Sequence, residues 1–274
     1  MKATYIDHMG TDLSVVNAAK VSFGKRSEWH YERSDGTVSP KTSDRMRGNK
    51  VLSKQDQRLI QFLARGCTSG DWDNLLTDVS NGTETAYWQK GGTEELESVL
   101  NYIRKMPSHW SPFAHTAISL HLKMPIFVAR QIMKHTTGIE YNEVSRRYVD
   151  SDPEFYSPSW RWAADNVKQG SGKELTEEEH HNLPSDEEYQ RVLSAAANTY
   201  HNLIKDGVAP EQARMVLPQS MYTEVIATGN LYAWANMYIQ RTDSHAQKET
   251  QDLAKQIGDI VKPLYPVSWA ALVS

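Results

Sequence analysis

The sequence contains almost no cysteine: Cys67 is the one thiol in 274 residues. A disulfide framework and a CxxC metal site are therefore excluded within one chain, and no metal site is expected. The HExxH and GxxxxGKS/T motifs of zinc proteases and P-loop NTPases are also missing. Because so few thiols suit a reducing compartment, we expect the protein in the cytoplasm.

Long apolar runs and an excess of positive charge are missing too. No stretch reaches the ~18 apolar residues of a membrane-spanning helix, and the opening MKATYIDHMG lacks the apolar core of a secretory signal. The formal net charge of −4 argues against a general nucleic-acid-binding surface. We therefore expect neither a membrane nor a nucleic-acid partner, although a few clustered arginines could still bind one anionic nucleotide.

The sequence does contain alternating helical and strand patterns. The apolar stripe in QDQRLIQFLAR predicts a helix over residues 55–65. Residues 118–124 alternate apolar and polar side chains, which predicts a half-buried strand. Pro125 suits the first turn of a helix that should run until Gly138.

The rest of the chain continues the mixture. Ser244 and Gln247 have the spacing of a capping box. Residues 24–54 and 67–92 are polar and poor in aliphatic side chains, so we predict two surface insertions there. Other expected elements are a strand and a helix before residue 24, helices over 94–106, 187–205, 231–240 and 244–261, and a strand over 221–228. With no repeat and no clear linker, we predict one α/β (α+β) domain over residues 1–274.

Candidate chemistry begins in the segment 129–148, ARQIMKHTTGIEYNEVSRRY. On the expected helix, Arg130 and Lys134 share one face, as do Gln131 and His135, because each pair is four residues apart. The two like charges repel mildly. An anionic partner would remove that cost.

The residues after this helix have the β-branched and aromatic content of an extended chain. Glu143, Ser145 and Arg147 would then point the same way. An acceptor, a hydroxyl and a guanidinium in one row suit a phosphate and a polar ring. Charged rows are also common on solvated surfaces, so the spacing alone leaves a purely structural explanation open.

A second polar cluster extends from Arg214 to Gln247. Arg214 lies in a short helix expected between two prolines, and arginine is suited to bidentate phosphate binding. A helix N-terminus also attracts anions. The other members of the cluster are Asn230, Asn236, Gln240, Arg241, Asp243, Ser244 and His245. Capping and surface ion pairs would explain the same residues without a ligand.

A third group, HWSPFAH at 109–115, places His109 and His115 beside aromatic side chains. Their spacing differs from that of a helical zinc pair, which needs i and i+4. Packing against the aromatic rings explains these histidines at least as readily as catalysis does.

The segment PIFVARQIMKHTTGIEYNEVSRRY resembles the signature of flavin-dependent thymidylate synthases. That signature has an Arg-His-Arg triplet, a short loop and then Asn-Glu-x-Ser-x-Arg-Tyr, which Asn142, Glu143, Ser145, Arg147 and Tyr148 match. Four more blocks occur in the family's order: AAKVSF at 18–23, HWSPFAH at 109–115, ARMVLP at 213–218 and RTDSHAQ at 241–247. Several separated motifs in the correct order make this a specific resemblance.

The chain departs from the family pattern at the triplet, which reads Lys134-His135-Thr136. The loop from His135 to Asn142 is also one residue longer than usual. Lysine supplies a charge without the bidentate fork of arginine, and threonine supplies none. Ala114 stands where the family has a glutamate. We therefore expect altered contacts to FAD.

The resemblance implies a twisted sheet flanked by helices, assembled as a homotetramer with active sites between subunits. It implies reductive methylation of dUMP to dTMP, with FAD as the cofactor and with methylenetetrahydrofolate and NADPH as co-substrates. Such cofactor chemistry needs no thiolate attack on the pyrimidine, so Cys67 is expected to be dispensable.

The motif match also implies roles for individual residues. The nucleotide would be bound by Gln131, Ser145, Arg147, Arg214 and Arg241. FAD would be bound by Ser22, Ser111, Lys134, His135, Glu143, Asn230, Asn236 and His245. The catalytic residues would be Arg241, Ser145 and His109, with His109 near the flavin and the folate.

Two alternatives stay open at this point. The changed loop and the insertions fit an enzyme of the same fold that hydroxymethylates a pyrimidine nucleotide or acts on dCMP. They also fit a non-catalytic, nucleotide-binding relic that has lost its affinity for FAD.

Overall fold

The computed structural model describes residues 1–40, 48–65, 109–148, 151–164, 170–181 and 184–273. The chain forms two compact units, each of which is described by itself. The first unit comprises Met1–Asp7, Ser119–Gly229 and Asn236–Ile260, and the second comprises His8–Ile118, Asn230–Ala235 and Val261–Ser274. Within the described residues, no helix is both long and apolar enough to cross a membrane.

A four-stranded sheet lies mainly in the first unit. Its order is β1 (Lys2–Met9), β5 (Ala117–Pro125), β7 (Tyr222–Gly229) and β6 (Ile139–Glu143). Strands β6 and β7 are antiparallel, with Ile139 opposite Gly229. In β5, Leu120, Leu122 and Met124 are fully buried while the residues between them are partly exposed. One face of the sheet is therefore in the core, as the period-two pattern predicts.

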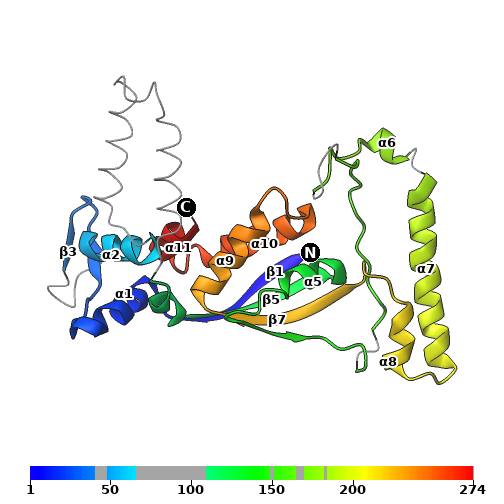
Figure 1. Cartoon of the computed structure of the whole chain (residues 1–274), viewed down its shortest axis with the longest axis horizontal. Coiled ribbons are helices and arrows are strands. Elements are labelled where there is room, and N and C mark those ends of the chain that lie inside the picture. The colour runs from blue at the N-terminus through cyan, green and yellow to red at the C-terminus, as the bar shows by residue number, and fades with distance from the viewer. Residues whose placement is uncertain (41–47, 66–108, 149–150, 165–169, 182–183, 274) are drawn as a thin grey trace, which may run out of the picture. The chain divides into compact units, whose positions relative to one another are not determined.

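Helices of the first unit supply the other side of this core. Helix α5 (Ile126–Ile132) contacts β7, and α10 (Lys248–Val261) is joined to β1 because Ala3 N donates to Gln256 Oε1 at 3.1 Å (Figure 1). The unit also contains α6 (Glu177–His181), α7 (Pro184–Lys205), α8 (Pro210–Ala213) with the 3₁₀ turn η4 (Arg214–Val216), and most of α9 (Leu231–Thr242).

The second unit is built around α1 (Asp12–Lys20), α2 (Lys54–Arg65) and α11 (Pro266–Val273), which contact one another. It includes the 3₁₀ turns η1 (Val21–Phe23) and η3 (Ser111–Ala114) and a small antiparallel sheet of β3 (Val38–Pro40), β2 (His30–Glu32) and β4 (Asn49–Val51). The buried Asp12 carboxylate accepts hydrogen bonds from Val267 N at 3.0 Å and Ser268 N at 2.8 Å, and so caps α11.

The mixed helical and antiparallel-sheet class is confirmed, but several local predictions are wrong. Helix α5 ends at Ile132 rather than near Gly138, so Lys134 and His135 lie in the turn and loop after it. Helix α10 begins at Lys248, and a turn replaces the capping box expected at Ser244. Neither α11 nor the small sheet inside residues 24–54 was predicted from a sequence pattern. The expected helix over 94–106, the 67–92 insertion and Cys67 lie outside the described residues.

Candidate active site

The ends of α5 and α9 bring two predicted site residues into contact in the first unit. Arg241 Nε donates to His135 Nε2 at 2.8 Å, so this ring nitrogen must be unprotonated. Burial of the imidazole, assisted by the Arg241 charge, lowers the pKa of His135. The contact therefore holds a guanidinium against a neutral acceptor rather than a carboxylate, and its charge is left unneutralised by this partner.

A second hydrogen bond joins the same two motifs. Gln131 Nε2 donates to Gln247 Oε1 at 2.7 Å. Tyr141 fixes the chain where α5 ends, because its hydroxyl donates to the carbonyl oxygens of Ile132 and His135, each at 3.1 Å. Burial raises the pKa of Tyr141, which keeps this donor protonated. The blocks ARQIMKHT and RTDSHAQ, far apart in sequence, thus meet through side chains that both blocks supply.

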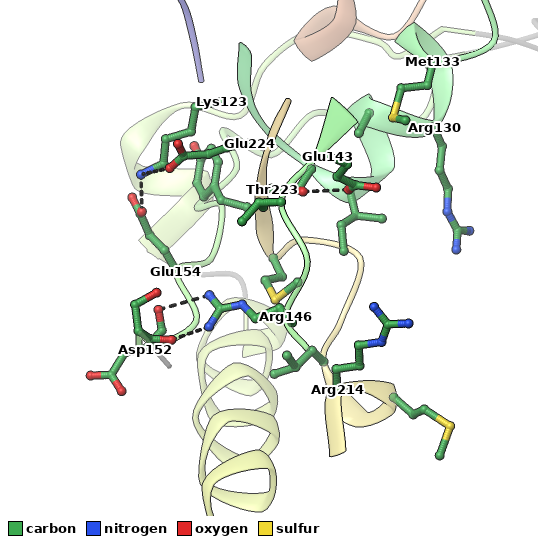
Figure 2. A pocket seen from close by; sticks show the side chains of 18 residues that line it. Lys123, Arg130, Met133, Glu143, Arg146, Asp152, Glu154, Arg214, Thr223 and Glu224 are labelled. Atoms are coloured by element: carbon green, nitrogen blue, oxygen red, sulfur yellow. Dashed lines mark hydrogen bonds and ion pairs between the residues drawn. The ribbon is translucent and has the colours of Figure 1, made fainter. Parts of the chain in front are cut away.

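A cavity of about 660 Å³ lies in the same unit (Figure 2). Glu143 and Arg214 line it, and Thr223 Oγ1 donates to Glu143 Oε1 at 2.7 Å. Arg130 and Arg146 line it as well, although neither was predicted as a site residue. The available signal was the i, i+4 spacing of Arg130 and Lys134, which favours an anionic partner, although α5 ends before Lys134.

Ser145 and Arg147 are placed differently from the prediction. Strand β6 ends at Glu143 and a turn follows at Arg146 and Arg147, so the extended row of three side chains does not form. Instead Arg147 Nε donates to Ser145 Oγ at 3.2 Å, and its guanidinium lies 5.0 Å from the centre of the Tyr148 ring. These two residues form a pair, but they do not line the cavity that Arg214 lines.

In the second unit, three predicted residues converge on a cavity of about 570 Å³. Ser22, His109 and Ser111 all line it, together with Lys25 and Phe62. The His109 ring stacks on Phe62 with the ring centres 5.3 Å apart. Because His109 N also donates to the carbonyl of Leu63 at 2.8 Å, the end of α2 holds this histidine at the cavity wall.

The remaining predicted residues occupy separate places. Asn230 caps α9, since its Oδ1 accepts from Ala233 N at 2.9 Å. Asn236 is half-buried on α9 and Lys134 is exposed. His245 is exposed in the turn before α10, where its Nδ1 contacts Asp243 Oδ1 at 2.8 Å. The structural explanation by capping therefore accounts for Asn230 without requiring a ligand.

Comparison with known proteins adds independent information. The family model described as "Thymidylate synthase complementing protein" matches residues 4–267. A flavin-dependent thymidylate synthase from Kosmotoga olearia is 34% identical over 82% of this chain and 93% of its own length. The enzyme of the same name from Thermus thermophilus is 39% identical over 97% of this chain and 73% of its own.

Solved structures agree with these sequence matches. A UMP/dUMP methylase, PolB from Streptomyces cacaoi, solved with 5-Br dUMP, superposes with a TM-score of 0.65 and 25% identity. The match covers 98% of this chain and 93% of that one.

The fold and the converging motifs thus define an enzyme of the methyltransferase class that depends on a flavin. The chain belongs to the family of thymidylate synthase complementing proteins, the flavin-dependent thymidylate synthases.

Proposed function

We propose that this enzyme transfers a one-carbon unit from methylenetetrahydrofolate to C5 of dUMP and releases dTMP. One observation above all supports this proposal: Gln131 and His135 of one motif are hydrogen-bonded to Gln247 and Arg241 of another. A shared ligand explains why both motifs place polar groups at one location. We further propose a homotetramer in the cytoplasm, with sites between subunits.

The groups that line the cavity of the second unit can be compared with the groups that FAD needs. The cavity of the second unit combines the Ser22 and Ser111 hydroxyls, the Lys25 ammonium and the Phe62 ring. Hydroxyls and an ammonium suit phosphate oxygens, and an aromatic wall suits a flat ring, so these residues fit part of an FAD molecule. In the first unit, Lys134, His135, Glu143 and His245 are the proposed flavin residues. Asn230 and Asn236 complete the proposed set.

When bound and reduced, the flavin supplies the hydride that completes the methyl group, and NADPH restores the reduced flavin. The protein's part is to bind, orient and polarise. Arg241 is proposed to lie by the pyrimidine ring and stabilise negative charge that develops on it, with His135 holding the guanidinium in place. Gln131, Ser145, Arg147 and Arg214 are proposed to hold the nucleotide, and His109 to lie near the folate.

The test is anaerobic turnover with dUMP, methylenetetrahydrofolate, FAD and NADPH, followed by mass analysis of the nucleotide. A product heavier by one methylene unit supports the proposal. A hydroxymethyl product, or turnover of dCMP in place of dUMP, would support the alternative enzyme. Arg241→Ala should lower turnover about a hundredfold, or about 2.7 kcal/mol, whereas the exposed neighbour variant Gln240→Ala should match the parent.

A further inference from the structure

The acidic side chains of the 660 Å³ cavity already have partners. Glu143 accepts a hydrogen bond from Thr223, and Lys123 contacts both Glu154 and Glu224 (Figure 2). Asp152 pairs with His201 at 3.2 Å, and Glu224 also pairs with His121 at 2.8 Å. Among the described residues, none of these carboxylates forms an ion pair with Arg130 or Arg214.

The guanidinium groups of the cavity are not equally engaged. Arg146 donates to the carbonyl oxygens of Ser151 and Asp152, and so braces the loop. Among the described residues, the Arg214 guanidinium makes one hydrogen bond, from Nε to the Glu211 carbonyl at 3.3 Å. For Arg130, the described part of the chain offers neither a hydrogen bond nor an ion pair. Arg130 and Arg214 thus bring two positive charges to one cavity without a described acidic partner.

The geometry of α5 explains why Arg130 points into this cavity. Val128 and Ile132 are fully buried, whereas Arg130 on the same helix is exposed. The cavity is lined by Ile126, Ala129, Arg130 and Met133, which have the i, i+3, i+4, i+7 spacing of one helix face. Figure 2 shows the Arg130 and Arg214 side chains both extending into the open space near Glu143.

We infer that Arg130 is a further substrate-binding residue, which binds the 5′-phosphate of the nucleotide together with Arg214. The inference rests on the proposed function, because that function supplies a phosphate dianion. A dianion supplies the countercharge that two guanidinium groups need, and its oxygens match the planar fork of arginine. Lys134 is not required for this role, because α5 ends before it and it does not line the cavity.

The experiment compares the binding of dUMP and deoxyuridine by calorimetry to the full chain and to Arg130→Gln, Arg130→Lys and Arg214→Gln. Arg130→Gln should raise the Kd for dUMP tenfold to a hundredfold, as expected for a lost charge-assisted hydrogen bond (roughly 10–100-fold). Its affinity for deoxyuridine should not change, since the nucleoside has no phosphate. Arg130→Lys should fall between. Arg191→Gln removes a charge that is also exposed, from α7 outside the cavity, and should bind dUMP as the parent does.

Other outcomes separate this inference from the proposed function. If Arg214→Gln weakens dUMP binding while Arg130→Gln does not, the inference is wrong and the proposed function stands. If the parent protein does not bind dUMP at all, the proposed function fails, and inorganic phosphate at constant ionic strength becomes the probe. If phosphate raises the melting temperature of the parent but not that of Arg130→Gln, the anion site is supported. If phosphate does not stabilise the parent, the anion site is refuted as well.

Discussion

At the scale of single residues, the hydrogen-bond partner of Arg241 is a histidine rather than a carboxylate. A carboxylate would neutralise the guanidinium, whereas neutral His135 orients it and leaves its charge available to a substrate. The same contact makes the arrangement sensitive to pH. A protonated imidazole could no longer accept the hydrogen bond and would repel Arg241.

The first prediction concerns that sensitivity. The pKa of His135 lies below its ordinary value of 6.5 because the ring is buried, with a further contribution from Arg241. A lowered pKa means that its contribution to stability is complete above pH 6.5 and is lost as the pH falls through the folded-state pKa. His135→Gln keeps an acceptor that does not titrate. Urea unfolding should therefore show the stability of the parent, relative to His135→Gln, constant above neutrality and decreasing in acid. A difference that does not change with pH would contradict this.

At the scale of elements, the sequence predicted well where a short-range pattern decides the structure. The alternation in β5, the apolar stripe of α2 and the end of α7 at Lys205 are all found. It predicted poorly where a tertiary contact decides. Helix α5 ends where the Tyr141 hydroxyl is hydrogen-bonded to the carbonyl oxygens of Ile132 and His135. No local sequence pattern predicts these hydrogen bonds.

The candidate site divides in the same way. Motif resemblance selected Gln131, His135 and Arg241, and in the structure Gln131 is hydrogen-bonded to Gln247 and His135 to Arg241. It could not give the position of Arg147 relative to Arg214, because that depends on the turn after β6. It also did not select Arg130, which lines the cavity and has no ion pair among the described residues.

The second prediction concerns the cap of α11. Asp12→Ala would leave the N–H groups of Val267, which is partly buried, and Ser268, which is fully buried, without their acceptor. We expect the free energy of unfolding to fall by about 1–3 kcal/mol, measured by urea denaturation. Asp12→Asn retains one acceptor oxygen and should lose less. Equal stability of Asp12→Ala and the parent would show that the cap is energetically unimportant.

The same position gives a third prediction, of opposite sign to that for His135. Burial raises the pKa of Asp12 above its ordinary 3.8. A raised pKa means that the contribution is complete below pH 3.8 and is lost as the pH rises through the folded-state value. Asn does not titrate. The free energy of unfolding of Asp12→Asn should therefore rise relative to that of the parent as the pH increases from about 4 towards neutrality, roughly the range where a buried carboxyl ionises. If the difference in unfolding free energy between variant and parent does not change across that range, the raised pKa of Asp12 is refuted.

At the scale of the whole molecule, composition constrains the chemistry. With one cysteine in 274 residues, any thiolate route to methylation would have to use Cys67. The fourth prediction is that Cys67→Ser keeps near-normal turnover of dUMP, because in the proposed reaction the flavin supplies the hydride and no thiol is needed. Collapse of activity in a Cys67→Ser protein with an unchanged circular dichroism spectrum would point to nucleophilic catalysis instead.

Ser22, His109 and Ser111 line the cavity of the second unit, and its proposed part in FAD binding can be tested on its own. Two lysines line it, but they differ in engagement: Lys20 is bonded to Asp56 and Ser27, while the described residues give the Lys25 ammonium no ion pair. Lys25 is therefore the lysine of this cavity that we expect to bind a phosphate of FAD. The fifth prediction is that Lys25→Ala weakens FAD binding about tenfold, the effect of one charge-assisted contact.

The measurement is a fluorescence titration of FAD at fixed ionic strength. Lys54→Ala is the matched control, because it removes an exposed lysine at the start of α2 that does not line the cavity. Lys20→Ala is unsuitable as a control, since it strips the buried Asp56 of its cation and would unsettle the unit itself. If Lys25→Ala and Ser111→Ala both bind FAD as tightly as the parent, this cavity does not hold the flavin phosphates. The flavin contacts would then have to be sought among Lys134, His135 and their neighbours in the first unit.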